Sequence, residues 1–126
     1  MRRWLRMCAL VIAVAAPTAG DIGSCGQPVV DLDAGKFFSE KKSVDCSQCL
    51  RCGIVSESCK AACSDERPRD SFEDDCFPLV HDGEVCLNAL RAGTCEEYIT
   101  YMDDLEPSVP TECAFCPPER KPEPQP

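Results

Sequence analysis

The chain has 126 residues, of which 12 are cysteine, 22 acidic and 13 basic, and its net charge is −9. A chain of this length forms one domain, and so small a domain is marginally stable unless it is cross-linked. Cysteine at this density is typical of exported proteins with a disulfide scaffold and rare in the reducing cytosol. The acidic balance excludes nucleic acid as a partner, because a polyanion is repelled by a negative surface.

Residues 1–24 have the pattern of a secretory signal peptide. Three arginines in MRRWLRM are followed by the apolar run CALVIAVAA and then by the small residues of PTAG. The apolar run is too short for a transmembrane helix, which needs about 20 apolar residues. Removal of this segment leaves ten basic and 21 acidic residues, a net charge of −11. We therefore expect an exported, acidic mature protein.

The signal ends in the tetrapeptide Ile22-Gly23-Ser24-Cys25. It resembles the lipobox of bacterial lipoproteins, in which an aliphatic residue and two small residues precede a cysteine. The resemblance covers residues 1–25. It implies that Cys25 carries a diacylglycerol and is the first mature residue, which gives a membrane anchor and a cell-envelope partner. Gly26 is not acidic, which in that family goes with the outer rather than the inner membrane.

Cysteine parity bears on where the signal is cleaved. Lipidation of Cys25 leaves ten cysteines, enough for five disulfides. Ordinary cleavage after Gly20 leaves eleven, which predicts a free thiol or a secreted dimer linked by the odd cysteine. The even number favours the lipoprotein, located at the outer membrane or in the periplasm, with a soluble secreted domain as the alternative.

Residues 25–45 are interpreted as a tether with little regular structure, which would hold the domain away from the membrane. The pairs Val29-Val30 and Phe37-Phe38 are its candidates for docking against the domain. Residues 117–126, PPERKPEPQP, are half proline and are expected to form a disordered tail.

Residues 46–116 combine ten cysteines with short helical patterns, most of them preceded by a residue that can cap a helix. The predicted helices cover 46–52, 57–64, 83–92 and the stretch from 95 to about 105, capped by Asp45, Ser56, Asp82 and Thr94, with a brief helical turn opened by Ser71 and Asp74. Few aliphatic residues are available for a core. We expect a small, disulfide-rich, mainly α domain of short helices and loops cross-linked by about five disulfides. The predicted disulfide cysteines are Cys46, Cys49, Cys52, Cys59, Cys63, Cys76, Cys86, Cys95, Cys113 and Cys116.

The spacing Cys46-x2-Cys49-x2-Cys52, with the distant pair Cys116-Pro117, resembles the iron–sulfur ligand set of bacterial ferredoxins. The resemblance implies a redox or electron-transfer protein with its cluster at these cysteines. This chain departs from the ferredoxin run at its next cysteine, Cys59, which follows after six residues and precedes lysine rather than proline. A four-thiolate zinc site built from two Cys-x2-Cys pairs, for example Cys49 and Cys52 with Cys113 and Cys116, is a further alternative. Disulfides account for all ten cysteines, so we expect no metal and no cofactor.

Catalytic residues are not evident in the sequence. His81 is the single histidine, and no serine or cysteine lies in a nucleophile context such as Gly-x-Ser-x-Gly. The adjacent carboxylates Asp103 and Asp104 are interpreted as part of a solvated face. The sequence therefore predicts a binding or structural module rather than an enzyme, without identifying its ligand.

Overall fold

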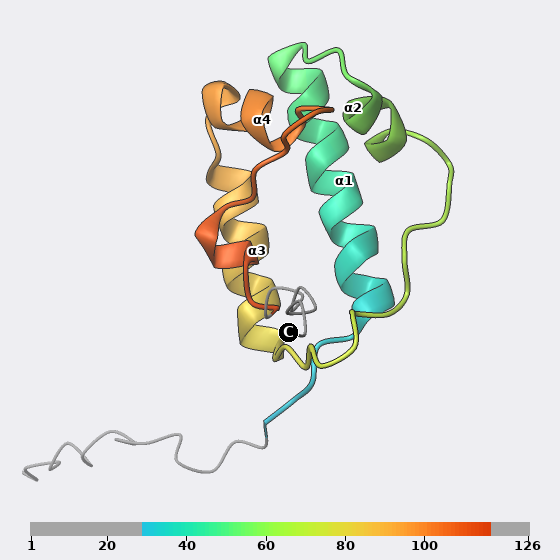
Figure 1. Cartoon of the computed structure of the whole chain (residues 1–126), viewed down its shortest axis with the longest axis vertical. Coiled ribbons are helices and arrows are strands. Elements are labelled where there is room, and N and C mark those ends of the chain that lie inside the picture. Colours follow the sequence, from blue (N-terminus) through green and yellow to red (C-terminus); the bar gives the residue numbers. More distant parts are fainter. Residues whose placement is uncertain (1–28, 117–126) are drawn as a thin grey trace, which may run out of the picture.

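A computed structural model describes residues 29–116 (Figure 1). In this range the chain forms helices and no strand, and five disulfides link it, which confirms the predicted fold class. The elements are α1 (Ala34–Cys52), α2 (Glu57–Ala62), α3 (Val80–Ala92), α4 (Cys95–Tyr101) and the short 3-10 helix η1 (Thr111–Cys113). The long helices α1 and α3 lie side by side, α2 and α4 pack on α1, and η1 packs on α3.

Helix α1 is much longer than the predicted helix over 46–52. It begins after Asp33, whose carboxylate accepts a hydrogen bond of 2.7 Å from the backbone N–H of Lys36. The interpretation of 25–45 as an irregular tether is therefore wrong for 34–45, which form the first part of this helix. The buried positions of α1 explain the error, since two of the four are polar: Phe37, Asp45, Gln48 and Cys49. Without an apolar stripe, the sequence shows no helical periodicity.

Asp45 and Gln48 are buried because side chains and carbonyls from later in the chain satisfy them. The Asp45 carboxylate accepts a hydrogen bond from the Tyr98 hydroxyl at 3.2 Å and forms an ion pair with Lys41 at 2.6 Å. The Gln48 amide donates to the backbone carbonyls of Leu90 and Arg91, both at 3.0 Å. Gln48 thereby donates to two carbonyls in the last turn of α3, where helical backbone donors run out; the Leu90 carbonyl also accepts from the Gly93 N–H. Burial and the nearby Asp45 carboxylate raise the pKa of Tyr98, so this network holds the phenol in its neutral form.

Two of the four predicted helix starts, at Ser56 and Thr94, are confirmed, whereas Asp45 lies inside α1 and does not cap a helix. The Ser56 hydroxyl accepts from the Cys59 N–H at 3.0 Å at the start of α2, and Thr94, the predicted cap of α4, forms a capping box with Glu97. Gly53 ends α1 in the left-handed conformation, with φ of 63°. These signals succeed because each depends on residues only a few positions apart.

Three further predicted helices have a wrong limit, and the first of them, α2, ends at Ala62 rather than 64. Helix α3 begins at Val80 rather than 83, and Asp82 lies within its first turn, where its carboxylate accepts from the Leu79 N–H at 2.8 Å. Helix α4 ends at Tyr101 rather than near 105, because the Asp103 carboxylate accepts from the two backbone N–H groups that follow Asp104 and turns the chain. The turn expected at Ser71 is not helical.

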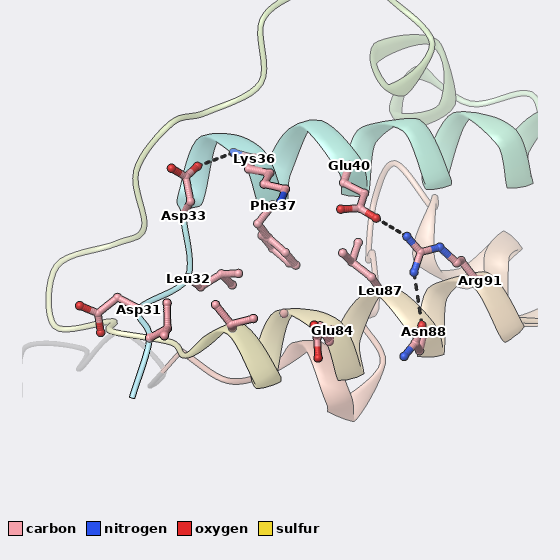
Figure 2. Close-up of a pocket in the computed structure, with 13 residues that line it drawn as sticks. Asp31, Leu32, Asp33, Lys36, Phe37, Glu40, Glu84, Leu87, Asn88 and Arg91 are labelled. Atoms are coloured by element: carbon pink, nitrogen blue, oxygen red, sulfur yellow. Dashed lines mark hydrogen bonds and ion pairs between the residues drawn. The ribbon is translucent and has the colours of Figure 1, made fainter. Parts of the chain in front are cut away.

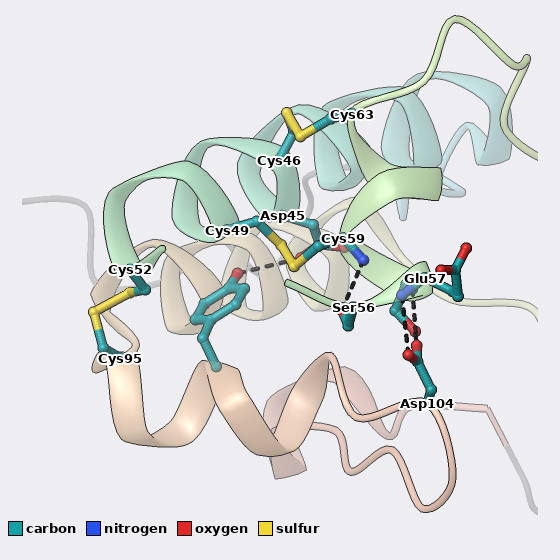
Figure 3. Close-up of a disulfide and its surroundings, with 12 residues drawn as sticks. Asp45, Cys46, Cys49, Cys52, Ser56, Glu57, Cys59, Cys63, Cys95 and Asp104 are labelled. Carbon is teal, nitrogen blue, oxygen red and sulfur yellow. Dashed lines mark hydrogen bonds between the residues drawn. A yellow bond between two sulfur atoms is a disulfide. The ribbon is translucent and has the colours of Figure 1, made fainter. Parts of the chain in front are cut away.

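The disulfides form two groups with one link between them. In the first group, Cys49–Cys59 is nested inside Cys46–Cys63, and both join α1 to α2 (Figure 3). The second group consists of Cys76–Cys116 and Cys86–Cys113, which fasten the C-terminal segment to the 76–86 region. Among the described residues, Cys52–Cys95 is the one disulfide that joins the two groups.

Candidate ligand groove

A groove of about 550 Å³ lies between the first two turns of α1 and the length of α3. Its floor is apolar and consists of Leu32, Phe37 and Leu87, whose side chains point into the space between the two helices (Figure 2). Val30 and Val80 line the groove at its more exposed end. A hollow of this size with an apolar lining falls within the range of about 300–1,000 Å³ that is common for small-ligand sites.

The N-terminal segment builds one wall of the groove by pairing with the start of α3. Asp31 and Leu79 form an isolated antiparallel bridge, with the Leu32 N–H donating to the Pro78 carbonyl at 2.9 Å. Leu32 is thereby pressed against Gly83, where a Cβ would lie 2.7 Å from both Leu32 methyl carbons. Glycine at this position therefore permits the close approach that shapes the groove.

The rim of the groove carries four carboxylates and two cations, a net charge of −2. Glu40 pairs with Arg91, which also donates to the Asn88 side chain at 3.3 Å (Figure 2). The Asp33 carboxylate is used as the cap of α1. The remaining two carboxylates, Asp31 and Glu84, form no hydrogen bond or ion pair within residues 29–116. The groove therefore offers an apolar interior beside two carboxylates that are free to bind a cation.

The ten cysteines predicted as disulfide partners are all paired. Cys46, Cys49 and Cys52 bond to three different partners, so their sulfurs are not the thiolates that an iron–sulfur cluster or zinc requires. The second zinc pair, Cys113 and Cys116, is likewise divided between two disulfides. Within the described part of the chain, no cluster of three His, Cys, Asp or Glu side chains has the geometry of a metal site. Cys25, the predicted lipidation site, lies outside the described residues.

Asp104 has a structural role that the sequence did not indicate. Its carboxylate accepts from the backbone N–H groups of Glu57 and Ser58, both at 2.9 Å, and from the Ser58 hydroxyl (Figure 3). These N–H bonds hold the pKa of Asp104 below its usual value. Asp104 is exposed, as expected for a solvated face, and it also secures the start of α2 from 46 residues away.

Comparisons with known proteins do not assign a family to this chain: no family model, curated protein or solved structure matches it. Among residues 29–116, no helix combines the length and hydropathy needed to cross a bilayer. His81 is exposed on the first turn of α3.

The groove residues were partly indicated by the sequence. Val30 belongs to an apolar pair expected to dock, and so does Phe37. Leu32, Leu87 and the two free carboxylates were not singled out, because nothing in a single sequence shows that residues 30–40 face residues 80–91.

Proposed function

We propose that this chain is an exported, disulfide-stabilised binding module that is anchored to a membrane by lipid on Cys25. We propose further that the groove between α1 and α3 binds a ligand with an apolar body and a cationic group. The observation that carries the proposal is the groove itself: an apolar hollow beside the free carboxylates of Asp31 and Glu84.

The disulfide pattern supports the export and anchoring parts of this proposal. Five disulfides in so short a chain are typical of proteins that fold in an oxidising compartment. The ten described cysteines are all paired with one another, so none of them is left to bond with Cys25. Cys8 would be removed with the signal peptide. A cysteine that follows Ile22-Gly23-Ser24 and is left out of an even set of disulfides fits lipidation.

The charge of the groove supports a cationic ligand. An apolar segment would replace water at Leu32, Phe37 and Leu87, which supplies the driving force. A positive group at the exposed end would then pair with Asp31 or Glu84. A carboxylate in that place would meet like charge, so the same apolar body with a negative end should bind more weakly.

Intact mass spectrometry of the membrane fraction tests the anchor. We expect a chain that begins at Cys25, carries lipid, and exposes ten thiols to alkylation only after reduction. A chain that begins at Asp21, or thiols that are alkylated without reduction, would contradict the anchored five-disulfide module. A species that halves in size on reduction would establish the secreted dimer instead.

Calorimetric titration of the mature chain, made soluble by Cys25→Ser, tests the groove. We expect decylammonium to bind more tightly than decanoate, which has the opposite charge. Val80→Arg places a guanidinium at the mouth of the groove and should weaken decylammonium binding about tenfold or more, because it adds repulsion and removes apolar contact.

The matched control for Val80→Arg is Val85→Arg. Val85 lies on the same helix, has the same 37% exposure as Val80, and does not line the groove. Binding should be unchanged in this variant. Equal effects of the two substitutions, or equal binding of the two amphiphiles, would refute the groove as the site.

A further inference from the structure

One end of the molecule exposes four large apolar side chains close together in the fold. Val29, Val30, Phe77 and Val80 are 75%, 56%, 84% and 37% exposed, and we call them the bridge face. All four lie within two residues of the bridge between Asp31 and Leu79, which the Val80 N–H extends by donating to the Val30 carbonyl at 3.0 Å. Helices α1 and α3 both begin at this end (Figure 1).

We propose that the bridge face rests in the headgroup region of a zwitterionic lipid bilayer. This inference depends on lipidation of Cys25, as proposed above. An apolar cluster of this kind is costly in water and marks an interaction surface. The bilayer is the surface that a lipid on Cys25 would hold next to the bridge face.

The length of chain between the anchor and the bridge face supports this assignment. Only three residues separate Cys25 from Val29. At about 3.3–3.6 Å per residue, a fully extended chain would place Val29 no more than about 14 Å from Cys25. Residues 34–45 belong to α1, whereas a tether running to residue 45 would have let the domain move far from the surface. The domain instead begins directly beside the lipid anchor.

Covalent attachment also lowers the affinity that the face needs. Because the anchor confines the domain to the membrane surface, contact with lipid is an intramolecular event at high effective concentration. Weak apolar contacts therefore suffice to hold one orientation. In that orientation α1 points its C-terminal end away from the bilayer, and a helix of 19 residues carries Gly53 about 28 Å from its start.

The charge near the bridge face determines which lipid headgroups the face can contact without electrostatic repulsion. Asp31 lies between the apolar pair and α1, and Asp75 comes two residues before Phe77. These carboxylates and the net charge of the mature chain oppose an anionic surface. We therefore assign a zwitterionic headgroup, such as phosphatidylcholine or phosphatidylethanolamine, as the chemistry that the face meets.

Tryptophan quenching by brominated phosphatidylcholine tests the proposal on the lipid-bearing full chain. The one tryptophan, Trp4, lies in the signal peptide, so a single introduced tryptophan is a unique probe in the processed protein. Phe77→Trp places it on the bridge face, with Val29→Trp as a second probe. Val55→Trp is the control, because Val55 is 90% exposed and follows the far end of α1.

We expect quenching several times stronger for Phe77→Trp and Val29→Trp than for Val55→Trp. Replacing half the lipid by phosphatidylglycerol should reduce it at low salt, and added salt should restore it. Equal quenching at both ends of a protein whose mass shows lipid would overturn this inference and leave the anchor intact. A blue-shifted but unquenched Phe77→Trp would show that protein covers the face, which also overturns it. Absence of lipid on Cys25 would overturn both proposals.

Discussion

Replacing Cys52 and Cys95 together by alanine is expected to lower the free energy of unfolding by about 4 kcal/mol. Their disulfide closes a segment with a sequence separation of 43 residues, and the entropy of closing a loop of that length accounts for the estimate. No other disulfide in the described residues connects the 46–63 group to the 76–116 group. Its loss therefore frees the two halves of the denatured chain from one another, which raises the entropy of the unfolded state.

The matched control is the double substitution Cys46→Ala and Cys63→Ala. This disulfide spans 17 residues, but Cys49–Cys59 is nested inside it and keeps most of that loop closed. The segments that are newly released total only about seven residues, so the expected loss is about 2 kcal/mol. Chemical unfolding followed by circular dichroism measures both, with the m-values compared because an opened chain exposes more surface. Equal losses would show that the nested arrangement has no protective effect.

The link between the two halves is reinforced by polar contacts of the buried Gln48 and the exposed Arg51. Gln48 and Arg51 of α1 bind the C-terminal carbonyls of α3, with the Arg51 guanidinium donating to the Gly93 carbonyl at 3.0 Å. Arg51 also donates to the Gln48 side-chain carbonyl at 2.5 Å. Cys52 is the next residue along α1, so the disulfide and the polar contacts fasten the same end of the helix pair.

The features that the sequence predicted correctly are those set by composition or by neighbouring residues. Cysteine density indicated a cross-linked helical domain, and the caps at Ser56 and Thr94 were visible as local patterns. The disulfide pairing was left open because it depends on which helices lie side by side. Cys46 and Cys49 bond to cysteines at α2 and Cys52 bonds to one at α4, because α1 packs against both helices.

The first part of α1 and the groove could not be predicted for a related reason. Asp45 and Gln48 look like surface residues in the sequence, because their partners, Tyr98 and the end of α3, lie 53 and 42 positions later. The groove requires the same long-range pairing, because the bridge at Asp31 and Leu79 brings its two walls together. Apolar periodicity in the sequence reveals neither buried polar residues nor pairing between distant segments.

Phe37→Ala is expected to lower the free energy of unfolding by about 3–5 kcal/mol, the usual effect of deleting a buried aromatic side chain. Phe37 is 4% exposed and packs against three other rings, with centroid distances of 5.2 Å to Phe38, 6.0 Å to Phe72 and 5.7 Å to Phe115. The same rings connect α1 to the loop before α3 and to the C-terminal segment. The cavity left by alanine would therefore weaken three parts of the fold at once, and would also remove part of the groove floor.

Phe77→Ala deletes the same side chain at a position that is 84% exposed, and it should change the free energy of unfolding by no more than about 0.5 kcal/mol. Comparing the unfolding free energies of Phe37→Ala and Phe77→Ala shows whether residues 34–45 form a solvated spacer or part of the folded domain. If they were a solvated spacer, Phe37→Ala would be as mild as Phe77→Ala, and the groove would lose its α1 wall. A loss confined to Phe37→Ala would place these residues inside the domain, which leaves only a few residues between the membrane anchor and the folded protein. The bridge face can contact the bilayer only if the chain between Cys25 and the folded domain is short. The burial of Phe37 therefore tests that condition.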